Sequence, residues 1–72
     1  MQAADGEIKA RVEEILRNSS LVDEKEVQVS VADSVVTLTG ELDSAIEKRR
    51  ARQLAEDTEG VKLVRDDMKI KN

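Results

Sequence analysis

The stretch that decides the fold is VQVSVADSVVTLTG, residues 27–40, which reads as one β-hairpin with an apolar face and a polar face. Apolar and polar side chains alternate along residues 27–31 and again along residues 36–40, the period-2 pattern of a half-buried strand. If Asp33 and Ser34 are the two central turn residues, both arms place their aliphatic side chains on the same face. A shift of one residue would turn one arm's valines to water, so the pattern specifies its own pairing.

This register makes specific cross-strand pairs, namely Val31 with Val36, Val29 with Leu38 and Val27 with Gly40. The opposite face of the hairpin then carries four polar residues: Gln28, Ser30, Thr37 and Thr39. A two-residue turn of type I′ needs positive φ at both central positions, which suits Asp33 better than Ser34. The turn is therefore the local conflict in the sequence.

Length and composition restrict the fold and the chemistry. A chain of 72 residues makes one small domain, which buries only about 60% of the surface of its unfolded chain. Cys, His, Pro and aromatic residues are all absent, so we expect no disulfide and no Cys/His metal site. No cofactor is predicted, and a weak cation site among the many carboxylates has no support in the sequence. No stretch approaches the roughly 20 apolar residues of a membrane span, and no apolar core of a signal peptide is present. A cytoplasmic protein and a mature piece of an exported one both remain open.

A first helix is predicted over residues 6–18, with Asp5 as its N-cap. Its apolar side chains form one stripe about 100° wide and are Ile8, Val12, Ile15 and Leu16. A second helix is predicted over residues 44–58, because Ser44 and Glu47 have the spacing of a capping box and Gly60 suits the position beyond the last turn. One half of its circumference is expected to rest on the apolar hairpin face, and it carries Ile46, Ala51, Leu54 and Ala55.

Residues 61–70 read as a last strand, with Val64, Met68 and Ile70 on one face. Strand alternation places the acidic Asp66 on the same apolar face, and either a bulge or a strand end would remove it from that face. The predicted fold class is α+β: a single small αββαβ sandwich, with two helices packed on one face of a three-stranded sheet. We expect residues 1–4 to be a disordered N-terminal tail and residues 5–71 to be the domain.

Three short patterns stand at a characteristic spacing: VTLTG at residues 36–40, ARQLA at residues 51–55 and GVKLV at residues 60–64. With them, residues 5–70 resemble the BON (bacterial OsmY and nodulation) domain family, and the departure is Ser34, where the family usually has glycine. The resemblance implies an αββαβ sandwich in bacterial envelope proteins, often in tandem, and hence a periplasmic or cell-envelope location. It also implies binding to phospholipid membranes or a role in holding envelope assemblies together. The family has no catalytic residues to carry over.

Charge is unevenly distributed along the chain. Residues 1–47 carry 4 basic and 11 acidic side chains, residues 48–72 carry 8 and 5, and the net charge is −4. The outer half of the second helix carries Lys48, Arg49 and Arg52, and these are the predicted contacts to anionic phospholipid headgroups. Further basic side chains that would join them are Lys62, Arg65, Lys69 and Lys71. At about 1 kcal/mol per basic group the adhesion would be weak and salt-sensitive, and the competing interpretation is a helix face that is merely solvated.

Three other functional classes make different demands on the sequence. A protein-interaction or scaffold module would use the polar sheet face or an edge strand, while the isolated domain is expected to be a monomer. An enzyme is disfavoured, because no His or Cys is present and the serines have no evident base. Nucleic-acid binding is disfavoured by the overall acidity and by the lack of an aromatic platform for base stacking.

Overall fold

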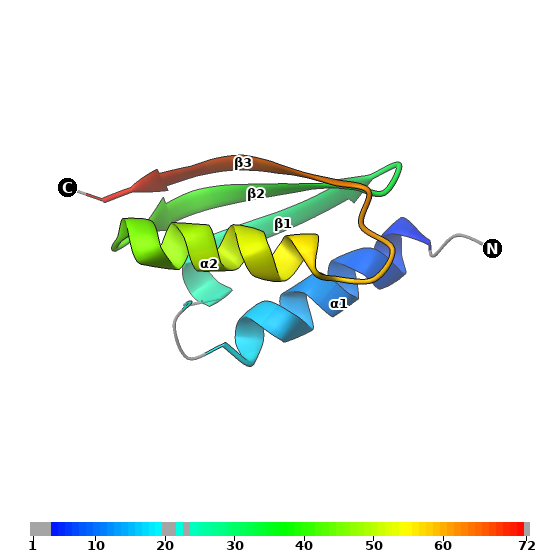
Figure 1. Ribbon diagram of the computed structural model, residues 1–72, viewed down its shortest axis with the longest axis horizontal. Coiled ribbons are helices and arrows are strands. Elements are labelled where there is room, and N and C mark those ends of the chain that lie inside the picture. The colour runs from blue at the N-terminus through cyan, green and yellow to red at the C-terminus, as the bar shows by residue number, and fades with distance from the viewer. Residues whose placement is uncertain (1–3, 20–21, 23, 72) are drawn as a thin grey trace.

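The computed structural model describes residues 4–19, 22 and 24–71, which follow the predicted αββαβ order (Figure 1). The elements are α1 (Asp5–Arg17), a short 3₁₀ helix η1 (Glu24–Glu26), β1 (Val27–Ala32), β2 (Val35–Leu42), α2 (Ala45–Glu56) and β3 (Leu63–Ile70). The sheet order is β1-β2-β3, with β1 antiparallel and β3 parallel to the central β2. Both helices lie on one face of this sheet (Figure 1), so the predicted α+β sandwich is confirmed.

The β1–β2 hairpin has the predicted register, with Val31 opposite Val36 and Val29 opposite Leu38. Its turn contains two residues, as predicted. Asp33 has φ 52° and Ser34 has φ 66°, so both occupy the left-handed region that this turn requires. The hairpin therefore follows from its own sequence, including the strained Ser34.

Asp5 secures the hairpin turn and does not cap its own helix. Its carboxylate accepts hydrogen bonds from the backbone N–H groups of Asp33 (2.9 Å) and Ser34 (3.1 Å). The N-cap residue of α1 is Ala4, without a side-chain cap, so the predicted N-cap role of Asp5 is wrong. The position of Asp5 before an amphipathic stretch favoured an N-cap, but its carboxylate binds the N–H groups of two turn residues that are distant in sequence. The rest of the predicted tail, residues 1–3, lies outside the described residues.

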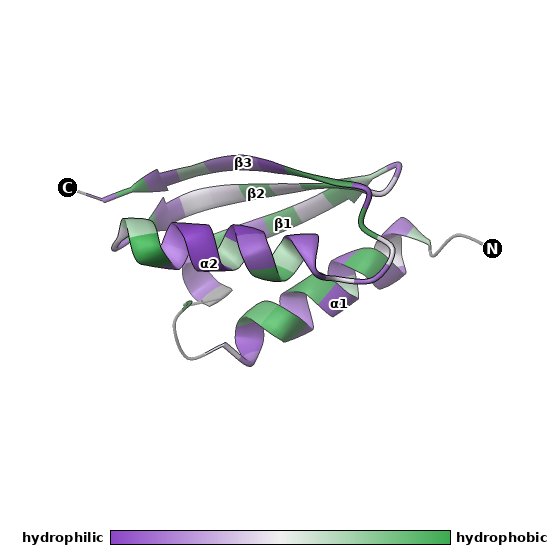
Figure 2. Cartoon of the chain, viewed as in Figure 1, coloured by the Kyte–Doolittle hydropathy of each residue, from purple (hydrophilic) through white to green (hydrophobic). Residues whose placement is uncertain are grey.

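The core lies between the sheet and the two helices, and Figure 2 shows apolar bands alternating with polar ones along both helices. Its buried apolar side chains are Ile8, Val12, Leu16, Val22, Val27, Val29, Val36, Leu38, Leu42, Ala51, Ala55 and Met68. In α1 the predicted stripe is buried except for Ile15, which is half-buried. Branched aliphatic side chains thus make up most of this interior, together with two alanines and Met68.

The buried side of α2 is narrower than predicted. Ala51 and Ala55 are fully buried, while Ile46 is 70% exposed, so its predicted place in the core is wrong. The two alanines set the rotation of the helix, and Ile46 lies about 140° around it from Ala51. The helix also ends at Glu56, earlier than predicted, because the hydroxyl of Thr58 donates a hydrogen bond to the Leu54 carbonyl (2.9 Å).

Asp66 is accommodated in β3 without a bulge or a strand end. The ladder with β2 continues in one register from Leu63 to Ile70. The Asp66 carboxylate accepts a hydrogen bond from the Met68 N–H (3.1 Å) and lies 3.9 Å from Nζ of Lys48 in α2. A lysine from the covering helix therefore compensates the acid, while Ile70, predicted on the same face, is 40% exposed.

Gly40 lies where two backbone segments approach each other closely. Its φ is +133°, and a Cβ at this position would collide with the carbonyl oxygen of Glu26, where η1 leads into β1. The last residue of the VTLTG pattern therefore has to be glycine for two separate reasons.

The chain enters and leaves the domain at opposite ends of its long axis (Figure 1). Ala4 lies at the end that carries the β1–β2 turn, whose amides are bound by Asp5. Lys71 lies at the other end, where its N–H donates to the Leu42 carbonyl (2.7 Å). Within the described part of the chain, neither helix has the length and apolar run needed to cross a bilayer.

Candidate functional site

The structure separates the three predicted lipid-binding residues into two groups. Lys48 is half-buried and turned toward β3, with its ammonium 3.9 Å from the Asp66 carboxylate. Arg49 and Arg52 are exposed on the outer side of α2. The two arginines are therefore available to a partner, whereas Lys48 already has an acidic neighbour.

Arg49 and Arg52 line a shallow open depression together with Gln53 and Glu56. Nε of Arg52 lies 3.5 Å from a Glu56 carboxylate oxygen, an exposed i,i+4 pair of the kind that contributes only about 0.3–0.5 kcal/mol. Among the described residues, no carboxylate is paired with Arg49. Guanidinium groups stay charged at any physiological pH and suit phosphate oxygens, so this surface can attract an anion, and its role in lipid binding stays a prediction.

The other predicted basic residues do not extend the α2 surface. Arg65 and Lys69 alternate along β3 with the side chains that face the helices, so they belong to the helix-free face of the sheet. Lys69 lies beside Glu41 in the β2–β3 ladder. Lys62 is exposed just before β3, and Lys71 takes part in an acidic cluster at the opposite end of that strand.

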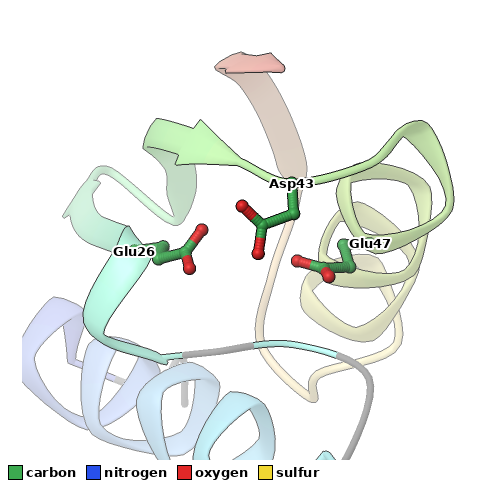
Figure 3. Close-up of side chains that lie close together, drawn as sticks. All are labelled: Glu26, Asp43 and Glu47. Atoms are coloured by element: carbon green, nitrogen blue, oxygen red, sulfur yellow. The ribbon is translucent and has the colours of Figure 1, made fainter. Parts of the chain in front are cut away.

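Three carboxylates from separate elements meet at that end: Glu26 of η1, Asp43 before α2 and Glu47 in the first turn of α2 (Figure 3). An oxygen from each lies within 4.8 Å of the others. Nζ of Lys71 lies 3.4 Å from Glu26 and 3.7 Å from Asp43. The negative charge of Glu26, and to a smaller degree that of Asp43, raises the pKa of Lys71 above its ordinary value of 10.5.

Carboxylate oxygens in such an arrangement are the ligands that Ca²⁺ and Mg²⁺ prefer. Here the cluster already contains a cation, because the Lys71 ammonium contacts two of its three members. We therefore assign it a structural role, in which the end of β3 is held to η1 and to the start of α2. Sequence reasoning missed this cluster, because its members are distant in the chain and Glu47 was considered only as a capping residue.

The helix-free face of the sheet has a polar centre and an apolar end. Gln28 and Ser30 are exposed there, while Thr37 and Thr39 are half-buried. Near the hairpin turn, Ala32, Val35 and Leu63 occupy adjacent register positions on the three strands, and Leu63 is 57% exposed. Strand alternation from Arg65 would have placed Leu63 on this face from the sequence alone.

Comparison with known proteins agrees with this architecture. The family model for the BON domain matches residues 4–72. Osmotically-inducible protein Y of Escherichia coli (strain K12) is 38% identical over 69 residues, an alignment that covers 96% of this chain and 32% of the relative. The chain therefore spans about a third of the length of that relative. Because the family model covers nearly the whole chain and the fold is the αββαβ sandwich described above, the protein belongs to the BON domain family.

Proposed function

We propose that this chain is a non-enzymatic binding module that associates weakly with anionic phospholipid surfaces, in a protein of the bacterial envelope. The observation that carries the proposal is the exposed pair Arg49 and Arg52 on the outer side of α2. Each arginine near an anionic bilayer contributes about 1 kcal/mol. Lys48 contributes less, because Asp66 already offsets its charge. The envelope location rests on membership of the family.

The overall charge of −4 makes orientation decisive for this binding. An acidic protein approaches an anionic surface only with its basic side, and the attraction decays over a Debye length of about 8 Å at physiological ionic strength. The association is therefore expected to be strong enough to detect at low salt and to weaken sharply as salt is added.

Co-sedimentation with vesicles tests the proposal. We expect the protein to sediment with phosphatidylglycerol vesicles at low salt and to remain in solution with phosphatidylcholine vesicles. The double variant Arg49→Gln/Arg52→Gln should bind about 10- to 30-fold more weakly, the loss of up to two contributions of about 1 kcal/mol.

A matched control separates a local effect from a change in total charge. Lys9 and Arg11 are exposed on α1, so Lys9→Gln/Arg11→Gln brings the net charge from −4 to −6, as the α2 double variant does. The α1 variant should bind nearly as well as the parent protein. If the parent protein fails to bind phosphatidylglycerol vesicles at low salt, the proposal is wrong.

A protein-interaction module is the second candidate, and one observation favours it: the apolar end of the helix-free sheet face at Ala32, Val35 and Leu63. This candidate predicts that the protein self-associates with rising concentration and that Leu63→Ser abolishes the association. The membrane proposal predicts a monomer throughout. Light scattering over a wide concentration range, with and without the substitution, distinguishes the two.

A further inference from the structure

Among the residues that the structure describes, Ile46 is the most exposed large hydrophobic one, at 70%. It is the second residue of α2 and lies on the far side of that helix from the core. A single exposed aliphatic side chain is common on protein surfaces, so exposure alone identifies nothing. The side chains next to Ile46 on the helix surface indicate what this exposed residue could bind.

Residues at i+3 and i+4 are the nearest neighbours along a helix surface, and for Ile46 these are Arg49 and Arg50, both exposed. At 100° per residue Ile46 falls between them in angular position, one turn nearer the start of the helix. Glu47, the adjacent acid, is half-buried and belongs to the cluster with Glu26 and Asp43, away from this side of the helix. The result is one branched aliphatic side chain with two exposed arginines one turn further along the helix, of which Arg50 donates a hydrogen bond to the Gln53 side chain (3.5 Å).

This combination suits the boundary between water and hydrocarbon. An apolar side chain can enter the acyl region while neighbouring arginines extend their charged ends to the phosphates. Resting on the membrane association proposed above, we infer that Ile46 is the residue that inserts into an anionic bilayer, with Arg49 and Arg50 at the level of the lipid phosphates. The charge complementarity of the two arginines favours a lipid surface as the occupant. The side of the first turn of α2 that carries Ile46 then faces the bilayer, while Glu47 lies toward Glu26 and Asp43.

The composition of the chain offers a direct test, because it contains no Trp, Tyr or Phe. In the variant Ile46→Trp, the only indole reports on position 46. We expect a blue shift of its emission on adding phosphatidylglycerol vesicles, and quenching when the lipid acyl chains are brominated. The matched control is Leu63→Trp, at the other strongly exposed apolar position, on the helix-free face of the sheet. Its emission should not respond.

A second measurement uses a substitution that the fold tolerates, since Ile46 is outside the core. Ile46→Ser should weaken vesicle binding by about 10-fold, as expected for the loss of a partly inserted aliphatic side chain. Circular dichroism should show the same secondary structure and thermal transition as the parent protein. The Leu63→Ser control should leave binding unchanged.

The outcomes separate this inference from the proposed function. If the protein sediments with anionic vesicles but the indole at position 46 is neither shifted nor quenched, the insertion of Ile46 is refuted and the membrane proposal stands. If no variant binds vesicles, both fail. Concentration-dependent self-association that Ile46→Ser abolishes, without any quenching by brominated lipid, would assign Ile46 to a protein contact and refute the inference.

Discussion

Removing the carboxylate of Asp5 is expected to lower the free energy of unfolding by about 2–3 kcal/mol. Asp5→Ala deletes both hydrogen bonds to the turn, at 2.9 and 3.1 Å. The exposed N–H of Asp33 regains water at little cost, but Ser34 is only 7% exposed and its N–H loses its acceptor, which costs about 1–3 kcal/mol. Loss of a negative charge in the first turn of α1 adds about 0.3–1 kcal/mol. A domain of this size has about 4–11 kcal/mol in total, so the effect is large.

Urea unfolding followed by far-UV circular dichroism measures this effect. Glu7→Ala is the matched control, because Glu7 is an acid in the same helical turn and forms an exposed ion pair with Arg11 at 3.8 Å. This substitution should cost about 1 kcal/mol or less. Asp5→Asn keeps one acceptor oxygen and should fall between the two. If Asp5→Ala and Glu7→Ala have the same unfolding midpoint, the contact between Asp5 and the turn does not stabilise the fold and our reasoning is refuted.

Three further predictions concern stability. Gly40→Ala should lower the free energy of unfolding by more than about 4 kcal/mol and abolish cooperative thermal unfolding, because the added Cβ collides with the Glu26 carbonyl. In the control Gly6→Ala the added Cβ meets nothing within 4 Å, and the substitution should stabilise α1 by up to about 1 kcal/mol. Equal unfolding midpoints for the two variants would contradict this prediction. Ser34→Gly should raise the free energy of unfolding by about 1 kcal/mol or less, and with it the urea midpoint, by relieving a positive φ. A lower midpoint would show that the buried serine side chain contributes more than the relief of strain. The pKa of Lys71 is raised in the folded protein above its ordinary value of 10.5. Its stabilising contribution is therefore complete below pH 10.5 and is lost as the pH rises through the raised pKa. The parent protein should be more stable than Lys71→Met at neutral pH, and a difference in stability that persists at strongly alkaline pH would refute this prediction.

The hairpin was predictable because its information is local. Its alternation fixes which side chains share a face, and a shift of one residue would expose the valines of one strand to water. The register could therefore be predicted without knowledge of the rest of the chain. Even the turn at Asp33 and Ser34 followed from the pairing alone, against the poor preference of serine for positive φ. The capping of α2 by Ser44, whose hydroxyl accepts from the Glu47 N–H (3.3 Å), was predictable for the same reason.

The errors concern partners that are distant in sequence. Asp5 was assigned to its own helix because the turn amides lie 28 and 29 residues further along the chain. Asp66 was treated as a conflict because Lys48, which compensates it, belongs to another element. Ile46 was placed in the core because a wheel shows which residues share half of a helix, but not how far that helix is rotated against the sheet. Charge along the sequence thus indicates the candidate site on α2, whereas the ion pair that separates Lys48 from the two arginines depends on the packing of α2 against β3.

The opposite placement of the two chain ends has a consequence for a longer protein that contains this domain. A segment before residue 4 would leave beside the β1–β2 turn, and a segment after residue 71 would leave past the end of β3 (Figure 1). Successive domains joined in this way would form a linear array. No linker would then have to cross α2. Several such units could then touch one extended surface at once, and contacts that are weak singly would combine into firm attachment through their high effective concentration.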